Sequence, residues 1–165
     1  GVIYQFSGQG ATLAKYIDIP NIYPAGRLDK DSEGLIILTD DGVLQQKISN
    51  PKYNKIKTYI AQLDGEITET AISTLVGGVR LKDGLTKPAK VRSISQPKWL
   101  WDRASPIRER KNIPTSWIEI SITEGKNRQI RRMTAKVGFP TLRLIRTRVD
   151  EWHLKGLLPG SYATF

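Results

Sequence analysis

The fold of this chain is decided by the stretch Gly26-Arg27-Leu28-Asp29-Lys30-Asp31-Ser32-Glu33-Gly34-Leu35-Ile36-Ile37-Leu38-Thr39-Asp40. Its first half is a polar turn, in which Asp29 follows Arg27 by two residues. Its second half is aliphatic, and residues 35–39 are predicted to form a buried strand. A turn that leads into a buried strand holds its side chains rigidly, as a reacting carboxylate requires. Asp29 is therefore the first candidate catalytic residue.

Two other interpretations of this stretch stay open. Positions 1, 3, 5, 6 and 12 of an EF-hand calcium loop would be occupied by Asp29, Asp31, Glu33, Gly34 and Asp40. Calcium is disfavoured because position 12 is not Glu, residues 36–38 resemble a strand, and no amphipathic helix precedes Asp29. Alternatively, Asp29 only caps or closes a turn, which is the commoner role of Asp in such a sequence.

The composition excludes several kinds of chemistry. The chain has 165 residues, so we expect one domain over residues 1–165. Without cysteine, and with His153 as its one histidine, it lacks the groups for disulfides, zinc sites, and Ser-His or Cys-His catalysis. No apolar run is long enough to cross a bilayer and no signal-peptide pattern is visible, which indicates the cytoplasm.

Positive charge is concentrated in one part of the chain. The formal net charge is +10, and residues 103–148 hold twelve Lys and Arg against three acidic residues. This window therefore carries nine of the ten net charges, which indicates a polyanionic partner such as a nucleic acid. The alternative is a solvated basic face that keeps the protein soluble. A membrane-surface helix is disfavoured because prolines interrupt the window.

The pattern of apolar residues predicts an α+β domain with a largely antiparallel sheet. Strands are expected at residues 35–39, 57–63, 79–81, 89–94, 117–122, 141–147, 151–154 and 161–165. Helices are expected at residues 12–17, at 43–49 with Asp41 as cap, at 68–75 with Thr68 as cap, and at 127–137. The strand 57–63 alternates and is expected to bury one face, and residues 102–115 are expected to form a loop.

The predicted helix 127–137 has a basic arc. Ile130, Met133 and Val137 recur at helical spacing and should face the core. The remaining arc carries Arg128, Arg131, Arg132 and Lys136, with Lys126 beside the helix N-terminus. Acidic partners four residues away are missing, so the arginines should repel one another unless an anion binds. The alternative is an ordinary solvated basic face.

Aromatic residues offer further contacts with a nucleic acid. Tyr59 is either a core residue with its hydroxyl at the rim or a platform for a nucleobase. Trp101 adjoins the basic loop and is a candidate for stacking on a base, whereas Trp99 and Trp117 are expected to be structural.

Three segments resemble one enzyme family, the RsuA-type pseudouridine synthases. Residues 26–39 resemble its first signature, which is G-R-L-D, a small hydroxyl residue, Gly, four aliphatics and Ser or Thr. Residues 57–59 resemble its K-x-Y strand, and residues 124–133 resemble its second motif, with Lys126 where Arg is commoner. Residues 99–101, 106–111 and 113–117 are similar to a short branch of the family that acts on large-subunit ribosomal RNA. The resemblance covers nearly the whole chain.

The resemblance implies a fold and a reaction. The fold would be a mixed, largely antiparallel sheet in two sub-halves, with helices packed on it and a central cleft. The reaction would isomerise a uridine of large-subunit (23S) ribosomal RNA to pseudouridine, without cofactor or metal, in a monomer. Asp29 would be the nucleophile, by attack at C1′ or C6 or by stabilising a glycal. Arg131 would lie beside it, with Arg27 and Arg128 as reserves, and Tyr59 would stack on the uracil or move the C5 proton.

The RNA would be held by basic and aromatic residues, namely Arg27, Arg128, Arg132, Lys126, Lys136, Arg108, Arg110, Lys111 and Trp101. The N-K-P segment usual before the first strand and the S4-like domain of many relatives are missing, so we expect that the N-terminus has been trimmed. The alternative function is a catalytically silent module that binds ribosomal RNA or assists ribosome assembly.

Overall fold

The computed structural model describes residues 1–6, 19–103 and 113–165. The strands are β1 (Val2–Phe6), β2 (Tyr23–Pro24), β3 (Glu33–Thr39), β4 (Lys57–Asp64), β5 (Arg80–Leu81), β6 (Gly84–Leu85), β7 (Lys90–Ile94), β8 (Thr115–Ile122), β9 (Thr141–Val149), β10 (Trp152–His153) and β11 (Tyr162–Thr164). The helices are α1 (Gly42–Ser49), the 3-10 turn η2 (Pro51–Tyr53), α2 (Glu69–Gly77) and α3 (Gln129–Lys136). Outside the described residues lie the helix expected at 12–17 and Arg108, Arg110 and Lys111.

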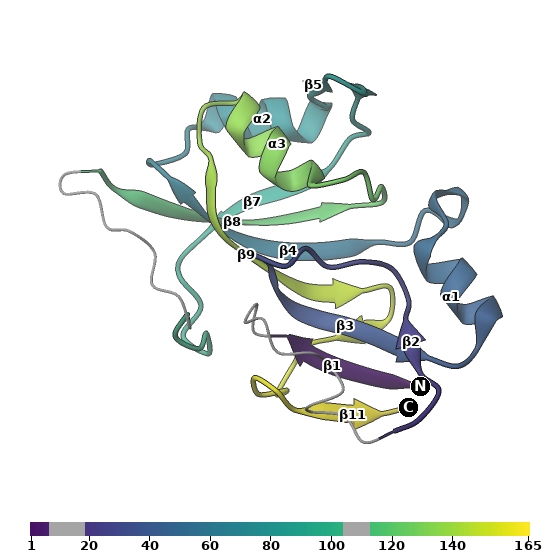
Figure 1. Ribbon diagram of the computed structural model, residues 1–165. Coiled ribbons are helices and arrows are strands. Elements are labelled where there is room, and N and C mark those ends of the chain that lie inside the picture. The colour runs from purple at the N-terminus through teal and green to yellow at the C-terminus, as the bar shows by residue number, and fades with distance from the viewer. Residues whose placement is uncertain (7–18, 104–112) are drawn as a thin grey trace.

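The main sheet consists of two antiparallel halves (Figure 1). Its strand order in the described chain is β11-β1-β3-β9-β4-β8-β7, with β2 and β10 attached to β3 and β9. Strands β3 and β9 pair in parallel and join the halves, whereas the other pairs of the sheet are antiparallel. The predicted α+β class with a largely antiparallel sheet in two sub-halves is therefore confirmed.

Glycine at position 34 makes the junction possible. Gly34 pairs with Arg146 across the parallel β3–β9 contact and has a φ of 109°. A Cβ atom at this position would collide with the backbone of Arg146. The glycine of the polar-to-aliphatic stretch thus allows the two halves of the sheet to approach each other.

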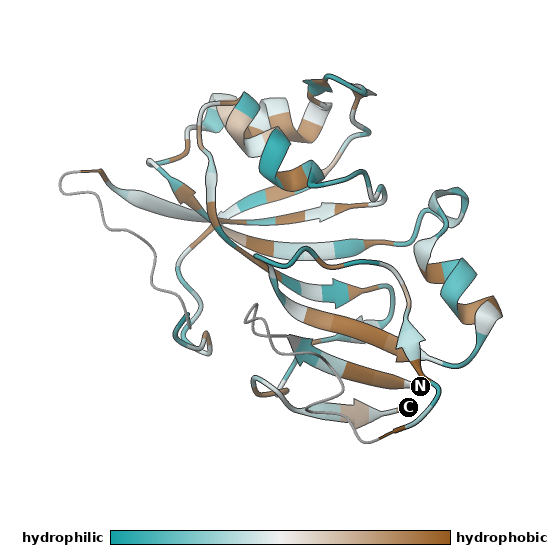
Figure 2. Cartoon of the chain, in the orientation of Figure 1, coloured by the Kyte–Doolittle hydropathy of each residue, from teal (hydrophilic) through white to brown (hydrophobic). Residues whose placement is uncertain are grey.

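The core lies on both faces of the sheet. Helices α2 and α3 lie side by side over β7, β8 and β4 (Figure 1), where Leu75 and Met133 pack with Ala61 and Leu63. A second cluster on the opposite side of β4 contains Ile60. Burial of one face only, as predicted for strand 57–63, is therefore wrong, because β4 is an inner strand with packed side chains on both sides. Figure 2 shows the hydrophobic run along β3, in which all seven residues are buried.

Both predicted helix caps are confirmed, whereas the predicted start of the last helix is wrong. Asp41 caps α1 by accepting from the backbone N–H of Val43 at 2.9 Å, and Thr68 caps α2. Helix α3 begins at Gln129 rather than at Asn127, because Arg128 has a left-handed φ of 50° and makes no side-chain cap. None of the helices in the described ranges is both long and apolar enough to cross a membrane.

Candidate active site

A pocket of about 310 Å³ opens between the two halves of the sheet. Its walls come from the loop before β3, from β4 and β9, and from the turn between β8 and α3. Its charged and phenolic lining residues are Arg27, Asp29, Lys57, Tyr59, Lys126, Arg128 and Arg146. The predicted central cleft is therefore present, and its lining carries five cationic side chains and one carboxylate.

Asp29 supplies that carboxylate from a tight turn. The Ser32 N–H donates to the carbonyl oxygen of Asp29 at 2.9 Å and closes the turn directly before β3. The side chain of Asp29 is 32% exposed and lies 3.8 Å from Nη1 of Arg128. The turn-closing interpretation is thus correct for the backbone of Asp29, while its side chain lines the pocket beside a guanidinium.

The guanidinium nearest to Asp29 belongs to Arg128 rather than to Arg131. Arg128 donates two hydrogen bonds to the Asp31 carboxylate, at 2.9 and 2.8 Å. Arg131 donates to the carbonyl oxygen of Asp31 at 3.0 Å and to Oγ of Ser32 at 3.3 Å, and it does not line the pocket. Its Nε is buried without a hydrogen-bond partner. Arg131 therefore binds the backbone of the turn that carries Asp29, while Arg128 lies beside the Asp29 carboxylate. The charge of Arg131 also acts on Asp29, and its catalytic role stays a prediction.

The Asp31–Arg128 pair leads to a pH-dependent prediction. The hydrogen bond from Arg128 lowers the pKa of Asp31 from 3.8 to about 2. Because the folded pKa lies below the unfolded value, the pair stabilises the fold above pH 3.8 and loses this effect as the pH falls through about 2. Asp31 is 45% exposed, so the contribution is at most about 1 kcal/mol. Urea titrations of wild type and Asp31→Asn should therefore differ near pH 5 and converge near pH 2, and a constant difference would contradict this.

Two pocket cations were missed at the sequence level. Arg146 stands opposite Tyr59 in the β4–β9 pairing, and Lys57 precedes Tyr59 by two residues. Arg146 donates to the carbonyl oxygens of Leu35 at 2.9 Å and Arg27 at 3.0 Å, so it ties the loop that carries Asp29 to β9. Two signals were available: Lys57 opens the K-x-Y motif, and Arg146 directly follows the apolar pair Leu144-Ile145 in a predicted strand.

Two of the basic side chains predicted to bind RNA, those of Arg132 and Lys136, do not line the pocket. Arg132 is paired with Asp83 at 2.7 Å, and Lys136 lies exposed at the far end of α3. The expectation that these arginines repel one another unless an anion binds is wrong for Arg128 and Arg132, because Asp31 and Asp83 approach them from other segments of the chain. Arg27 and Lys126 do line the pocket.

Trp101 is half-buried, and its indole nitrogen is bound to the core of the protein. Its indole Nε1 donates to Glu33 at 2.8 Å, and the guanidinium of Arg143 lies 5.9 Å from its ring. Glu33 and Arg143 in turn form a buried ion pair at 2.8 Å. Trp101 also lines a second cavity together with Trp99, so its stacking on a nucleobase stays a prediction. Trp99, expected to be structural, is 57% exposed.

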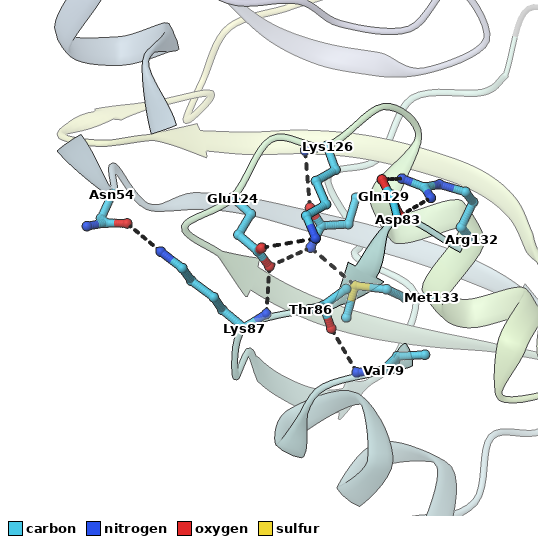
Figure 3. A network of polar contacts seen from close by, with 10 residues as sticks. All are labelled: Asn54, Val79, Asp83, Thr86, Lys87, Glu124, Lys126, Gln129, Arg132 and Met133. Atoms are coloured by element: carbon cyan, nitrogen blue, oxygen red, sulfur yellow. Dashed lines mark hydrogen bonds and ion pairs between the residues drawn. The ribbon is translucent and has the colours of Figure 1, made fainter. Parts of the chain in front are cut away.

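A polar network fixes the turn that presents Lys126 and Arg128 (Figure 3). The buried Gln129 accepts from the backbone N–H of Lys126 at 3.2 Å and donates to Glu124 at 3.0 Å. Glu124 also accepts from the backbone N–H of Lys87 at 2.7 Å. The turn is therefore anchored to the segment after β6 before any ligand binds.

The calcium interpretation finds no support in this geometry. Glu33, at position 5 of the proposed calcium loop, is held by Arg143. Within residues 1–6, 19–103 and 113–165, no three His, Cys, Asp or Glu side chains gather closely enough to hold a metal ion.

The comparison with known proteins agrees with this site. Residues 10–136 match the RNA pseudouridylate synthase family. The chain is 53% identical over 151 residues to ribosomal large subunit pseudouridine synthase E of Vibrio parahaemolyticus, covering 92% of this chain and 63% of that protein. It is 47% identical over 166 residues to the protein of the same name from Xanthomonas campestris pv. campestris, covering 98% of this chain and 89% of that protein.

Solved structures give the same result. A crystal structure described as a pseudouridylate synthase superimposes with a TM-score of 0.77 at 27% identity, covering 98% of this chain and 68% of that one. The match extends over both halves of the sheet and over the pocket between them. On these grounds of sequence and structure, the chain belongs to the RNA pseudouridylate synthase family.

Proposed function

We propose that this chain converts a uridine of large-subunit ribosomal RNA to pseudouridine, with Asp29 as the nucleophile. The observation that carries the proposal is the placement of Asp29, which among the described residues is the one carboxylate that lines the pocket, beside five cations. The names of the relatives from Vibrio and Xanthomonas support the ribosomal substrate. Attack on a nucleoside requires a nucleophilic oxygen, and the guanidinium of Arg128 lies 3.8 Å from the Asp29 carboxylate, where it can hold that oxygen in place.

The reaction balances without an added reactant. The bond between N1 of uracil and C1′ breaks, the base rotates, and a bond between C5 and C1′ forms. C5 loses a proton and N1 gains one, so nothing is oxidised. Asp29 acts by attack at C1′, by attack at C6, or by stabilising a glycal. We infer that the chain works as a cytoplasmic monomer without metal or cofactor.

The pocket also suits a flipped nucleotide. A uridine must leave its stack to reach Asp29, which costs a few kcal/mol. Tyr59 offers a partly exposed ring inside the pocket on which the base can stack. Arg27 and Arg128 are exposed at the pocket and can contact the RNA backbone, which offsets the cost of flipping.

The deciding experiment is tritium release from large-subunit RNA labelled at C5 of uridine. Isomerisation replaces the C5–H bond, so an active enzyme releases tritium in proportion to the pseudouridine formed. The alternative, a silent RNA-binding module, predicts salt-dependent binding and no release. Binding without release under conditions where a related synthase is active would therefore overturn the proposal.

Tyr59 provides a more detailed test. We expect Tyr59→Phe to keep RNA affinity but to lower single-turnover pseudouridine formation by about 100-fold, because the phenol is needed to move the C5 proton. Tyr59→Leu should lose affinity as well, since the stacking ring is gone. Full activity of Tyr59→Phe would restrict Tyr59 to stacking.

A further inference from the structure

In the described part of the chain, three pocket cations form no ion pair: Arg27, which is exposed, and Lys57 and Arg146, which are withdrawn from water. Arg146 is 3% exposed, and both of its hydrogen bonds go to neutral backbone carbonyls. Lys57 is half-buried on the same side of β4 as Tyr59. In the described part of the chain, neither Lys57 nor Arg146 forms an ion pair.

Keeping the charges of Lys57 and Arg146 away from water without a counter-charge destabilises the folded protein. Removing a charge from water is costly unless a counter-charge compensates. Burial lowers the pKa of Lys57, and the nearby charge of Arg146 lowers it further. By contrast, Arg128 and Arg132 are each paired with a carboxylate, that of Asp31 and that of Asp83. Two like charges kept at a cost beside a pocket are characteristic of functional sites.

We propose that Lys57 and Arg146 form an anion subsite for the phosphate group of the nucleotide that enters the pocket. The identity of this nucleotide as a uridine rests on the proposed function. Lys57 and Tyr59 are two residues apart on β4, so their Cα atoms are separated by roughly 6–7 Å. This distance is similar to that between a nucleobase and its own phosphate. A base stacked on Tyr59 therefore brings its phosphate within reach of Lys57, and the fixed charge of Arg146 adds to the attraction.

The geometry gives the two residues different tasks. The guanidinium of Arg146 is held by Leu35 and Arg27, so it contributes a fixed positive charge. The Lys57 Nζ lies beside the backbone of Gly125, 3.6 Å from where a Cβ would stand there. Its flexible stem lets the ammonium adjust to the phosphate.

The test compares ligands that differ by one phosphate. Uridine, uridine 5′-monophosphate and uridine 3′-monophosphate are titrated by calorimetry at constant ionic strength into wild type, Lys57→Met and Lys90→Met. Lys90 is an exposed lysine on β7 and serves as the matched control. We expect wild type and Lys90→Met to prefer one monophosphate over uridine by about tenfold or more, and Lys57→Met to lose that preference with unchanged affinity for uridine. The isomer that is preferred identifies the phosphate.

The outcomes separate this subsite from the proposed function. An equal preference for the monophosphate in wild type and Lys57→Met, or none in wild type, overturns the subsite. So does an equal loss of affinity for uridine and its monophosphates in Lys57→Met, which would mean a contact with the base. A Lys57-dependent preference without any tritium release supports the subsite and overturns the isomerase. Lys57→Met should melt no lower than wild type, because it removes a buried charge.

Discussion

Replacing Asp29 with Asn is expected to abolish pseudouridine formation while RNA binding persists. The amide keeps the shape of the side chain but cannot act as an ionised nucleophile, so turnover should fall by at least about 10⁴-fold. Asp29 is 32% exposed and its nearest cation, Arg128, stays paired with Asp31, so the fold should be unaffected. Tritium release measures turnover, and a filter-binding titration measures affinity for the RNA.

Asp40→Asn is the matched control for this variant. Asp40 is an exposed carboxylate directly after the other end of β3, so its replacement removes the same charge without touching the pocket. It should retain wild-type turnover. Pseudouridine formation by Asp29→Asn at a rate near that of Asp40→Asn would show that another group breaks the glycosidic bond.

The second large effect is expected in the core, where Glu33→Gln should destabilise the fold by about 3–5 kcal/mol. The two oxygens of Glu33 accept from Arg143 at 2.8 and 2.9 Å, and one of them also accepts from Trp101. The side chains of Glu33 and Arg143 are only 2% and 6% exposed. Neutralising Glu33 leaves a buried guanidinium without a counter-charge, so the melting temperature should drop by roughly 6–20 °C.

Two further variants isolate the cause of this loss. Glu33→Gln combined with Arg143→Met should be more stable than Glu33→Gln alone, because the unpaired charge is removed. Glu119→Gln breaks the exposed pair with Arg92 and should change the stability by no more than about 1 kcal/mol. If the double variant were less stable than Glu33→Gln, lost packing rather than the unpaired charge would be responsible.

Local sequence was sufficient to predict a structural element wherever residues close in sequence make the contacts that form it. The caps Asp41 and Thr68 bind backbone N–H groups two or three residues away, so the starts of α1 and α2 could be predicted. The alternating strand at 117–122 and the aliphatic strand at 35–39 also form as predicted. Asp29 could be singled out because its turn and the following strand are contiguous.

Other features of the fold and of the site could not be predicted, because they depend on contacts between segments that are far apart in the sequence. The start of α3 shifted because Gln129 bonds with the Lys126 backbone and with Glu124. Asp31 approaches Arg128 across 97 residues, and Glu33 approaches Arg143 across 110. Composition counts both arginines as part of a basic surface. The fold instead places Arg128 in an exposed ion pair and Arg143 in a buried one.

The sequence by itself determined the fold class and the family and singled out Asp29 as the candidate nucleophile, because these follow from local patterning and contiguous motifs. Only the tertiary structure decided which cations meet that carboxylate. Partners of a charged side chain are set by the parallel pairing of β3 with β9 and by the turn before α3. Those contacts join distant segments, and periodicity along one segment carries no information about them.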